Sequence, residues 1–332
     1  MTDLCTVRYD YDGFMKTVSY TISRILSDDL AAIDLLRNKL LTIPINPRIE
    51  YLFRWNAMIE TIYGSFVLSK VPISRAEIES ILSKPRHAKT PTSTAIDAYA
   101  NAYRWITQHW SGNPLSVTCG DIEVLATLAL SQPHRTHEAF SNQEREISIF
   151  CKYLTSQNDH PIVSAGLTHA YFLHSKIGTQ DQGKIARLAS NVYLAQSGYD
   201  IRGMNHPESI WASDPKAYEF ALDEALQLGQ LTPWLEYVAA SIKTSYLHLI
   251  TALEKTSHGI HSPQEQAKAF LSNRQLDILD LAASPNTKLT NRSVQLHFHI
   301  SAITASRDLA RLASIGQLYT HGKGRSVYYT RV

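Results

Sequence analysis

Cysteine is scarce in this sequence, and long apolar runs are absent. The three cysteines, Cys5, Cys119 and Cys151, are far apart and form no Cys-x-x-Cys pair. A sparse, odd set of this kind is typical of proteins of the reducing cytosol, where each thiol stays free. There is no run of about 18 consecutive apolar residues, and no apolar signal segment follows the first residues. We therefore expect a cytoplasmic protein with no membrane partner.

The spacings of common metal and phosphate sites are missing as well. His134 and His137 lie close to Glu138, but the His-Glu-x-x-His pattern of a zinc helix is absent. We expect residues 131–142 to form a loop and to bind no metal. The run 322–324 lacks the G-x-x-x-x-G-K-S/T spacing of a phosphate-binding loop, so it predicts a tight β-turn.

Composition and charge indicate an ordinary globular chain with one basic segment. The 332 residues suffice for two or three domains, with 44% hydrophobic and 19% charged residues. Residues 272–332 carry eight Lys and Arg against three Asp, a net charge of +5, whereas the whole chain carries only +2. This local excess of positive charge favours a nucleic-acid surface in that segment.

A polar loop between two helical runs stands out within residues 169–191. Gly183, Lys184 and Arg187 fall at the start of the second run, where unpaired backbone N–H groups and the helix dipole favour an anion. An ordinary interhelical loop with a solvated basic turn is the alternative. The apolar residues that recur at helical spacing on the two sides are Ile162, Leu167, Ala170 and Leu173, then Ile185, Leu188, Val192 and Leu194.

This stretch resembles the signature loop of the Fic (filamentation induced by cAMP) domain family, H-x-F-x-D/E-G-N-G/K-R-x-x-R. Arg187 matches the last arginine, Lys184 the preceding arginine and Gly183 the second small residue. The segment 160–163 resembles the approach to the first core helix of the family, and the segment 231–235 resembles its final segment. The resemblance implies a helical Fic-like domain.

The upstream half of the loop departs from the family's motif. Lys176 stands where the family has its catalytic histidine, and Gln180 stands where it has the acid that holds a divalent metal. Lysine is a poor base at neutral pH, and an amide is a weaker magnesium ligand than a carboxylate. Asp181, in place of the first glycine, adds a negative charge to the anion-binding loop. We therefore expect no transfer of AMP from ATP and no bound cofactor.

Two other interpretations of the loop stay open. The retained Gly183, Lys184 and Arg187 would suit a residual nucleotidyl (AMP) transferase that uses ATP and Mg²⁺, or a pseudoenzyme that senses a nucleotide or another anionic effector. Many Fic relatives also carry an S/T-x-x-x-E-G/N helix whose glutamate occupies the phosphate site. The nearest match, Ile59–Gly64, has Tyr63 at the glutamate position. We expect that glutamate to be lost.

Prolines, glycines and polar segments divide the rest of the chain. Pro47 opens a helix that is expected to run to Leu68, with Gly64 as a candidate stop. Residues 255–263 are polar and contain glycine, as linkers do. The expected parts are an N-terminal helical segment (1–46), a degenerate Fic-like domain (47–253), a linker or connecting helix (254–271) and a C-terminal domain (272–332).

The C-terminal segment carries three helix signals followed by a hairpin signal. Ser272, Thr290 and Ser301 are expected N-caps, and residues 317–320 and 326–330 are expected strands around a glycine-containing turn. Three helices and a β-wing, with a helix-turn-helix between the second and third helices, are typical of a winged-helix domain. The run from Ser301 also resembles the recognition helix of bacterial winged-helix regulators, in which S-x-x-T-x-x-R-D-L is common.

The third of these helices is the candidate DNA-reading helix. Four of its residues share one face and are expected in the core, namely Ala302, Ala305, Leu309 and Leu312. Those left for the major groove and its phosphates are Ser301, Ile303, Thr304, Ser306 and Arg307. At the tip of the wing, Lys323 and Arg325 suit the adjacent backbone or minor groove. A winged helix used only for protein contacts is the alternative.

Together these patterns predict a mainly α protein, with a Fic-like helical bundle followed by a winged helix-turn-helix that has a small β-wing. The favoured function is a DNA-binding transcriptional regulator in which the inactive Fic-like domain serves as scaffold, dimerisation unit or sensor. Because one small module buries little DNA surface, we expect a homodimer on double-stranded DNA.

Overall fold

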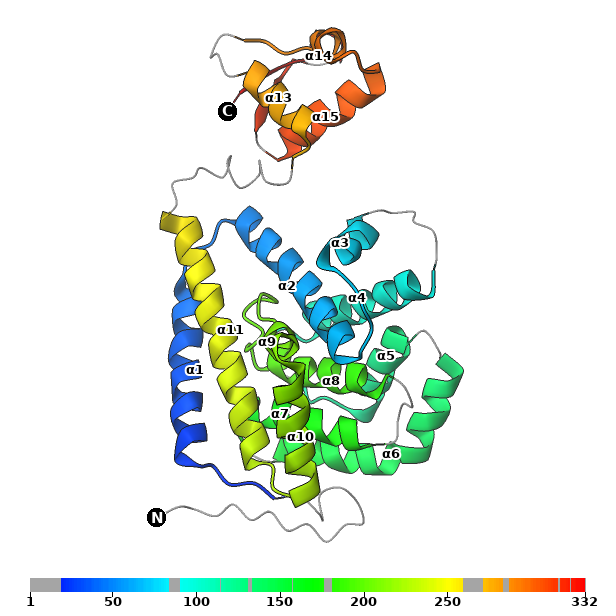
Figure 1. Ribbon diagram of the computed structural model, residues 1–332, viewed down its shortest axis with the longest axis vertical. Helices are drawn as coiled ribbons and strands as arrows, with labels where there is room; N and C mark the ends of the chain where they lie inside the picture. Colours follow the sequence, from blue (N-terminus) through cyan, green and yellow to red (C-terminus); the bar gives the residue numbers. More distant parts are fainter. Residues whose placement is uncertain are drawn as a thin grey trace. The chain divides into compact units, whose positions relative to one another are not determined.

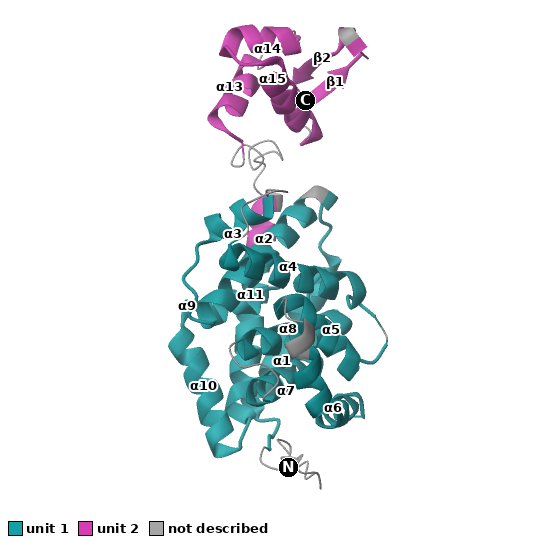
Figure 2. Ribbon diagram, turned by 90° about the vertical axis from the view of Figure 1, so that its right-hand side faces the viewer, with its two compact units in different colours: residues 1–251 teal, residues 252–332 magenta. Residues whose placement is uncertain are grey.

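The chain is mainly helical and divides into two compact units, residues 1–251 and 252–332 (Figures 1 and 2). The strands of its described part form one two-stranded sheet, so the expected mainly α class is confirmed. No helix in the described ranges is both long enough and apolar enough to cross a lipid bilayer. The computed structural model describes residues 19–83, 90–113, 115–130, 133–156, 158–175, 181–258, 271–282, 287–315, 317–322 and 324–331.

The first unit is built from helices, and proline begins six of those described. Proline suits the first helical position because its missing N–H has no partner there in any case. The helices are α1 (Arg24–Thr42), α2 (Pro47–Leu68), α3 (Arg75–Ser83), α4 (Pro91–His109), α5 (Cys119–Leu130), α6 (Pro133–Ser156), α7 (Pro161–His174), α8 (Gln182–Gln196), α9 (Pro207–Ser213), α10 (Pro215–Leu228) and α11 (Thr232–His258), whose last turns pass residue 251.

The helices α7 and α8 form the centre of the first unit. Every residue from Ile162 to Phe172 and from Lys184 to Ala195 is buried. The two helices pack against each other, while α2, α4 and α5 pack against α8 and α10 packs against α7 (Figure 1). The polar side chains that α7 and α8 carry are therefore buried too, and each needs an internal partner.

A short extended segment ties the start of the described chain to the turn before α11. The backbone N–H of Ser19 donates to the carbonyl of Gly229 at 2.8 Å, and that of Leu231 donates to the carbonyl of Ser19 at 2.7 Å. The helix that follows, α1, lies beside α11 and is joined to it by an ion pair between Asp29 and Lys243 (Figure 1). The start of the described chain and the segment from Gly229 into α11 are thereby held together.

The turn after α8 has an unusual backbone. Ile201 and Arg202 have φ angles of 47° and 57°, and Gly203 follows with 74°. A left-handed conformation costs a β-branched residue about 1–3 kcal/mol. Arg202 offsets this strain because its Nη2 donates to the carbonyl of Leu41 at 2.8 Å and its Nη1 to Glu50 Oε2 at 3.3 Å. These two bonds hold the turn against the connection between α1 and α2.

Gly64 does not end α2, contrary to the expectation from the sequence. The helix continues to Leu68. Gly64 faces the first turn of α9, where an added Cβ would lie 2.5 Å from the carbonyl oxygen of Glu208. The glycine is needed for the close approach of two helices and not for a helix stop.

The loop expected at residues 131–142 is also wrong, because α6 is helical from Pro133 onward. The proline is the signal for a helix start at this position. Within the helix, Nδ1 of His137 lies 2.6 Å from Oε1 of Glu123. Over the described ranges, no three His, Cys, Asp or Glu side chains are grouped as a metal site would require.

The second unit combines three helices with a β-hairpin. Strands β1 and β2 are antiparallel, with Leu318 opposite Arg331, and Leu289 adds a bridge to Tyr329 on the far side of β2. The elements are α13 (Asn273–Leu281), α14 (Asn291–Phe298), α15 (Ala302–Ser314), β1 (Leu318–His321), the short 3₁₀ turn η2 (Gly324–Ser326) and β2 (Tyr328–Arg331).

The helix starts of the second unit agree with the sequence. Ser272, Thr290 and Ser301 are the N-caps of α13, α14 and α15, and each side chain accepts a backbone N–H of the first turn. Helical spacing in the sequence predicts Leu276 and Leu279 on the buried face of α13, but the structure buries Ile278 with Leu279 and leaves Leu276 half-buried. Local capping is therefore predicted better than the direction of each apolar side chain.

The buried face of α15 also differs at two positions. Ala302, expected in the core, is exposed, and Asp308 is buried. The carboxylate of Asp308 accepts hydrogen bonds from Nε of Arg274 at 2.7 Å and from Nε2 of Gln275 at 2.8 Å. These two partners on α13 offset the cost of burying a charge.

Candidate functional site

The start of α8 holds the residues expected to form an anion site. Lys176 and Gln180, at the base and metal-ligand positions of the Fic motif, lie outside the described residues. Asp181 is the N-cap of α8, but its side chain makes no capping bond. Its Oδ1 lies 2.7 Å from Nζ of Lys184, and that ammonium group lies 4.5 Å from the centre of the Phe66 ring. A carboxylate three residues earlier in the chain therefore already neutralises the cation that a phosphate would need.

Arg187 is turned into the core of the unit. It is 2% exposed. Its Nε donates to Oγ of Ser65 at 2.8 Å, and its Nη2 donates to the Ser65 carbonyl at 2.9 Å and to Oγ of Ser69 at 2.8 Å. Gly183 lies against the same guanidinium, since an added Cβ would be 3.0 Å from Nη1. The structure thus brings Gly183 and Arg187 together, but the arginine ties α8 to α2.

The residue of α2 that bonds to Arg187 is Ser65, two positions after Tyr63, which stands at the glutamate position of the S/T-x-x-x-E-G/N motif. Tyr63 lies elsewhere on the helix, with the Arg75 guanidinium 3.7 Å from its ring centre. Residues two apart on a helix point about 200° apart, so Tyr63 and Ser65 lie on different sides of α2. Hydroxyl groups hold Arg187, and no sequence pattern marks Ser65 for this role.

Glu208 is a buried carboxyl group that no sequence motif marks. It is 0% exposed in the first turn of α9. Its Oε1 accepts a hydrogen bond from Nδ2 of Asn191 at 2.6 Å, and its Oε2 has no partner within the described ranges. Burial raises the pKa of Glu208 to about 7, against smaller opposing effects that include Asn191 and Arg187. The sequence does not reveal the burial of Glu208, because an acidic residue in the first turn of a helix is normally solvated and interacts with the helix dipole.

His169 is buried in an aromatic cluster. Its Nε2 lies 2.7 Å from the hydroxyl of Tyr218, and the ring centres of Trp211, Tyr218 and Trp234 lie 5.3, 5.7 and 5.1 Å from its own. Burial, with a smaller contribution from Arg187, lowers the pKa of His169 well below its ordinary value. The imidazole is therefore a neutral packing group at physiological pH.

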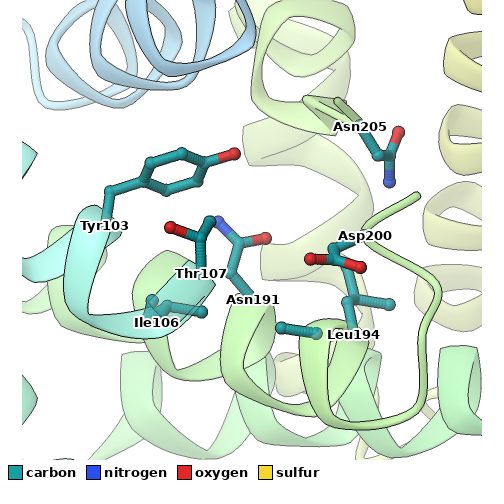
Figure 3. A pocket seen from close by; sticks show the side chains of 8 residues that line it. Tyr103, Ile106, Thr107, Asn191, Leu194, Asp200 and Asn205 are labelled. Carbon is teal, nitrogen blue, oxygen red and sulfur yellow. The ribbon is translucent and has the colours of Figure 1, made fainter. Parts of the chain in front are cut away.

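A small cavity lies between α4, α8 and the turn that follows α8 (Figure 3). Tyr103, Asn191, Asp200 and Asn205 are among its lining residues, and its volume is about 10 Å³. That volume holds about one water molecule and no nucleotide. Burial raises the pKa of Asp200 to about 6, and the backbone amide of Gly203 opposes this rise.

A larger cavity of about 160 Å³ lies where α6, α7 and α8 meet the segment before α5. Hydroxyl groups line much of it, including those of Thr155 and Ser164, and among the described residues Asp159 is its only charged lining residue. The hydroxyl of Tyr20 donates to Oδ2 of Asp159 at 2.6 Å. A negative group in the wall does not suit a phosphate.

In the second unit, the first two turns of α15 bring together the five residues assigned to the major groove. Ser301, Ile303, Ser306 and Arg307 are exposed, and Ile303 retains 66% of its accessible surface. Thr304 is half-buried, and its hydroxyl lies 2.9 Å from that of Ser301. The surface they form is polar, with one apolar side chain.

The one acidic residue of α15 does not share that surface. Asp308 is 5% exposed and bonded to Arg274 and Gln275 of α13. The outer face of α15 therefore carries positive charge without a carboxylate. Of the two expected wing residues, Lys323 lies outside the described residues, and Arg325 falls in η2 between the two strands.

No protein-family model matches the chain, and no curated protein matches it in sequence. Solved structures share its fold. A Fic family protein from Desulfovibrio desulfuricans G20 superposes with a TM-score of 0.59 at 14% identity, over 94% of this chain and 97% of that one. Fic-1 from C. elegans gives 0.56 at 16% identity, over 70% and 73%. A Fic domain containing signaling protein from Bacteroides thetaiotaomicron VPI-5482 gives 0.50 at 15%, over 66% and 94%. The chain thus has a Fic-like helical fold, as the resemblance implied.

Proposed function

We propose that this protein is a DNA-binding transcriptional regulator in which a Fic-like domain without AMP-transfer activity is joined to a C-terminal winged helix. The observation that carries the proposal is the outer surface of α15. Its first two turns expose Ser301, Ile303, Ser306 and Arg307, while its one carboxylate, Asp308, faces inward. The N-terminal turns of a helix with this composition suit base edges and phosphates.

The remainder of the second unit supports the same proposal. His299, with φ 50° and ψ 43°, is the left-handed C-cap of α14 and allows the short connection to α15 that a helix-turn-helix needs. The hairpin of β1 and β2 follows α15 in the order expected of a wing. The net charge of +5 over residues 272–332 favours a polyanionic partner.

The start of α8 supports a Fic-like domain that does not transfer AMP. Asp181 neutralises Lys184, and the guanidinium of Arg187 is bonded to Ser65 and Ser69. Both cations therefore already bind groups of this chain, and their arrangement does not suit a polyphosphate. The position of the family's metal-binding acid is a glutamine in the sequence, which does not fit Mg²⁺ well either.

Binding of the full chain to double-stranded DNA tests the proposal. In a gel-shift assay with the DNA upstream of its own gene, we expect binding that weakens steeply between about 50 and 200 mM salt. Arg307→Ala is expected to weaken it at least about fivefold, as for the loss of a groove or phosphate contact. The matched control is Arg24→Ala, on an arginine of α1 whose side chain is 94% exposed. Absent or salt-independent binding would contradict the proposal.

The homodimer and the inactivity of the Fic-like domain are tested separately. Light scattering of the full chain, with and without DNA, is expected to give the mass of a dimer on its site. Incubation with labelled ATP and Mg²⁺ is expected to leave the protein and its partners unlabelled. Incorporated label that Lys176→Ala abolishes would instead support the nucleotidyl transferase. Calorimetric binding of ATP without turnover would support a nucleotide-sensing pseudoenzyme.

A further inference from the structure

Ile303 is a large apolar side chain that protrudes from the first turn of α15. It is 66% exposed, and it belongs to the turn whose residues meet base edges in helix-turn-helix proteins. Ser301 and Thr304 are occupied with each other there, since their hydroxyls lie 2.9 Å apart and the Thr304 N–H donates to Ser301 Oγ at 3.2 Å. Ile303 is therefore the largest exposed side chain of this turn, and no hydrogen bond holds it as one holds Ser301 and Thr304.

Arg307 lies four residues after Ile303, so the two side chains are neighbours on one face of the helix. Both are exposed. A cation beside a single apolar side chain on this face of α15 suits a surface of phosphates and base edges. An apolar contact with another protein favours a contiguous apolar patch.

We propose that Ile303 contacts the 5-methyl group of a thymine in the major groove and so selects a T·A pair in each half-site. This inference rests on the proposed DNA-binding function. In the major groove, thymine presents a methyl group beside its O4 acceptor, whereas cytosine presents an N4 donor. A branched hydrocarbon side chain makes no hydrogen bond, so the methyl group is the feature that it can distinguish.

The size of the effect follows from the loss of one buried methyl group. Replacing the contacted thymine by uracil removes that methyl group and leaves the Watson–Crick pair unchanged. We expect the dissociation constant of the full chain to rise about fourfold, the effect of removing one methyl group from a dry contact. The same replacement is expected to have no effect on the Ile303→Ala variant.

The experiment begins with selection of bound sequences from a random DNA library by the full chain. Each thymine of the selected site is then replaced by uracil, and affinities are measured at one fixed salt concentration. The wild-type comparison needs no variant, so it does not depend on how a substitution folds. The matched control is Leu296→Ala, since Leu296 of α14 is 67% exposed. This variant is expected to keep the fourfold penalty.

The outcomes separate the two proposals. A selected site without thymine, or a uracil penalty that persists in Ile303→Ala, would overturn the methyl contact while DNA binding stands. Equal loss of DNA binding in Ile303→Ala and Leu296→Ala, with a change of oligomer mass, would also overturn it and assign both residues to a protein interface. Failure to enrich any DNA would refute the proposed function itself.

Discussion

Replacing Glu208 with glutamine is expected to stabilise the first unit at alkaline pH and to have little pH-dependent effect below about pH 5. The carboxyl group is 0% exposed, and burial raises its pKa from an ordinary 4.5 to about 7. The folded state therefore binds this proton more tightly than the unfolded state. Its contribution to stability is complete below pH 4.5 and is lost as the pH rises through 7.

The magnitude follows from the two pKa values. The interval from 4.5 to about 7 corresponds to about 3 kcal/mol at about 1.4 kcal/mol per pH unit. Glutamine keeps an oxygen for the hydrogen bond from Asn191 and has no charge to bury. Its amide N–H₂ would lie where Oε2 of Glu208 has no partner in the described part of the chain. The free-energy cost of leaving this amide group unpaired is the same at every pH, so it does not contribute to the change in the variant's stability between two pH values.

The assay is urea unfolding followed by tryptophan fluorescence at pH 5 and pH 8. The five tryptophans all lie within residues 1–251 and therefore report on the first unit alone. The stability of the variant relative to wild type is expected to rise by about 2–3 kcal/mol between the two pH values. Asp200 is present in both proteins, so its own titration cancels.

Glu224→Gln is the matched control, because Glu224 is an exposed glutamate of α10. We expect its effect to change by less than about 0.5 kcal/mol between the two pH values. If Glu208→Gln behaves like this control, the carboxyl group at 208 does not hold its proton in the core, and the account of its burial is refuted.

Three further changes test other contacts. Arg187→Ala is expected to destabilise the first unit by at least about 3 kcal/mol in urea unfolding, because the three hydrogen bonds to Ser65 and Ser69 and a buried side chain of α8 are lost. Asp181→Asn should lower the stability of the first unit by only about 1 kcal/mol in a thermal melt, since the Asp181 side chain is 37% exposed. Added phosphate should restore part of this stability by replacing the carboxylate beside Lys184. Gly322→Ala should raise hydrogen exchange in β1 and β2, because φ is +79° and an added Cβ would lie 2.6 Å from the Ser326 carbonyl oxygen. Unchanged exchange there would show that the turn tolerates a side chain.

Features set by neighbouring residues are predictable from this sequence. The N-caps Ser272, Thr290 and Ser301 agree with the structure because each bond is made within one turn of the chain. The order of α7 and α8 follows from helical periodicity and from the resemblance to the Fic motif. The Fic-like fold was therefore predictable although the identity to solved Fic structures is only 14–16%.

Features that depend on contacts between distant segments were not predictable. The sequence indicates a helix stop at Gly64, because the α9 backbone that lies against this glycine belongs to a distant segment. The buried position of Glu208 has the same cause, since α2, α8 and α9 enclose it together. Asp308 reads as a surface residue in the sequence, and its partners Arg274 and Gln275 lie on another helix. Periodicity gives the spacing of a buried face but not the partner that makes a buried charge tolerable.

The pairing of α1 with α11 sets an order of events during biosynthesis. Thr21 is bonded to Thr232, 211 residues further along the chain. At about 5–20 residues per second, the ribosome takes roughly 10–40 s to bridge that interval. Throughout that time α1, whose buried residues include Leu26, Leu30, Ile33 and Leu40, lacks the hydrogen-bond and ion-pair partners that α11 supplies. The contacts between α1 and α11 thus form only after nearly the whole first unit has been made.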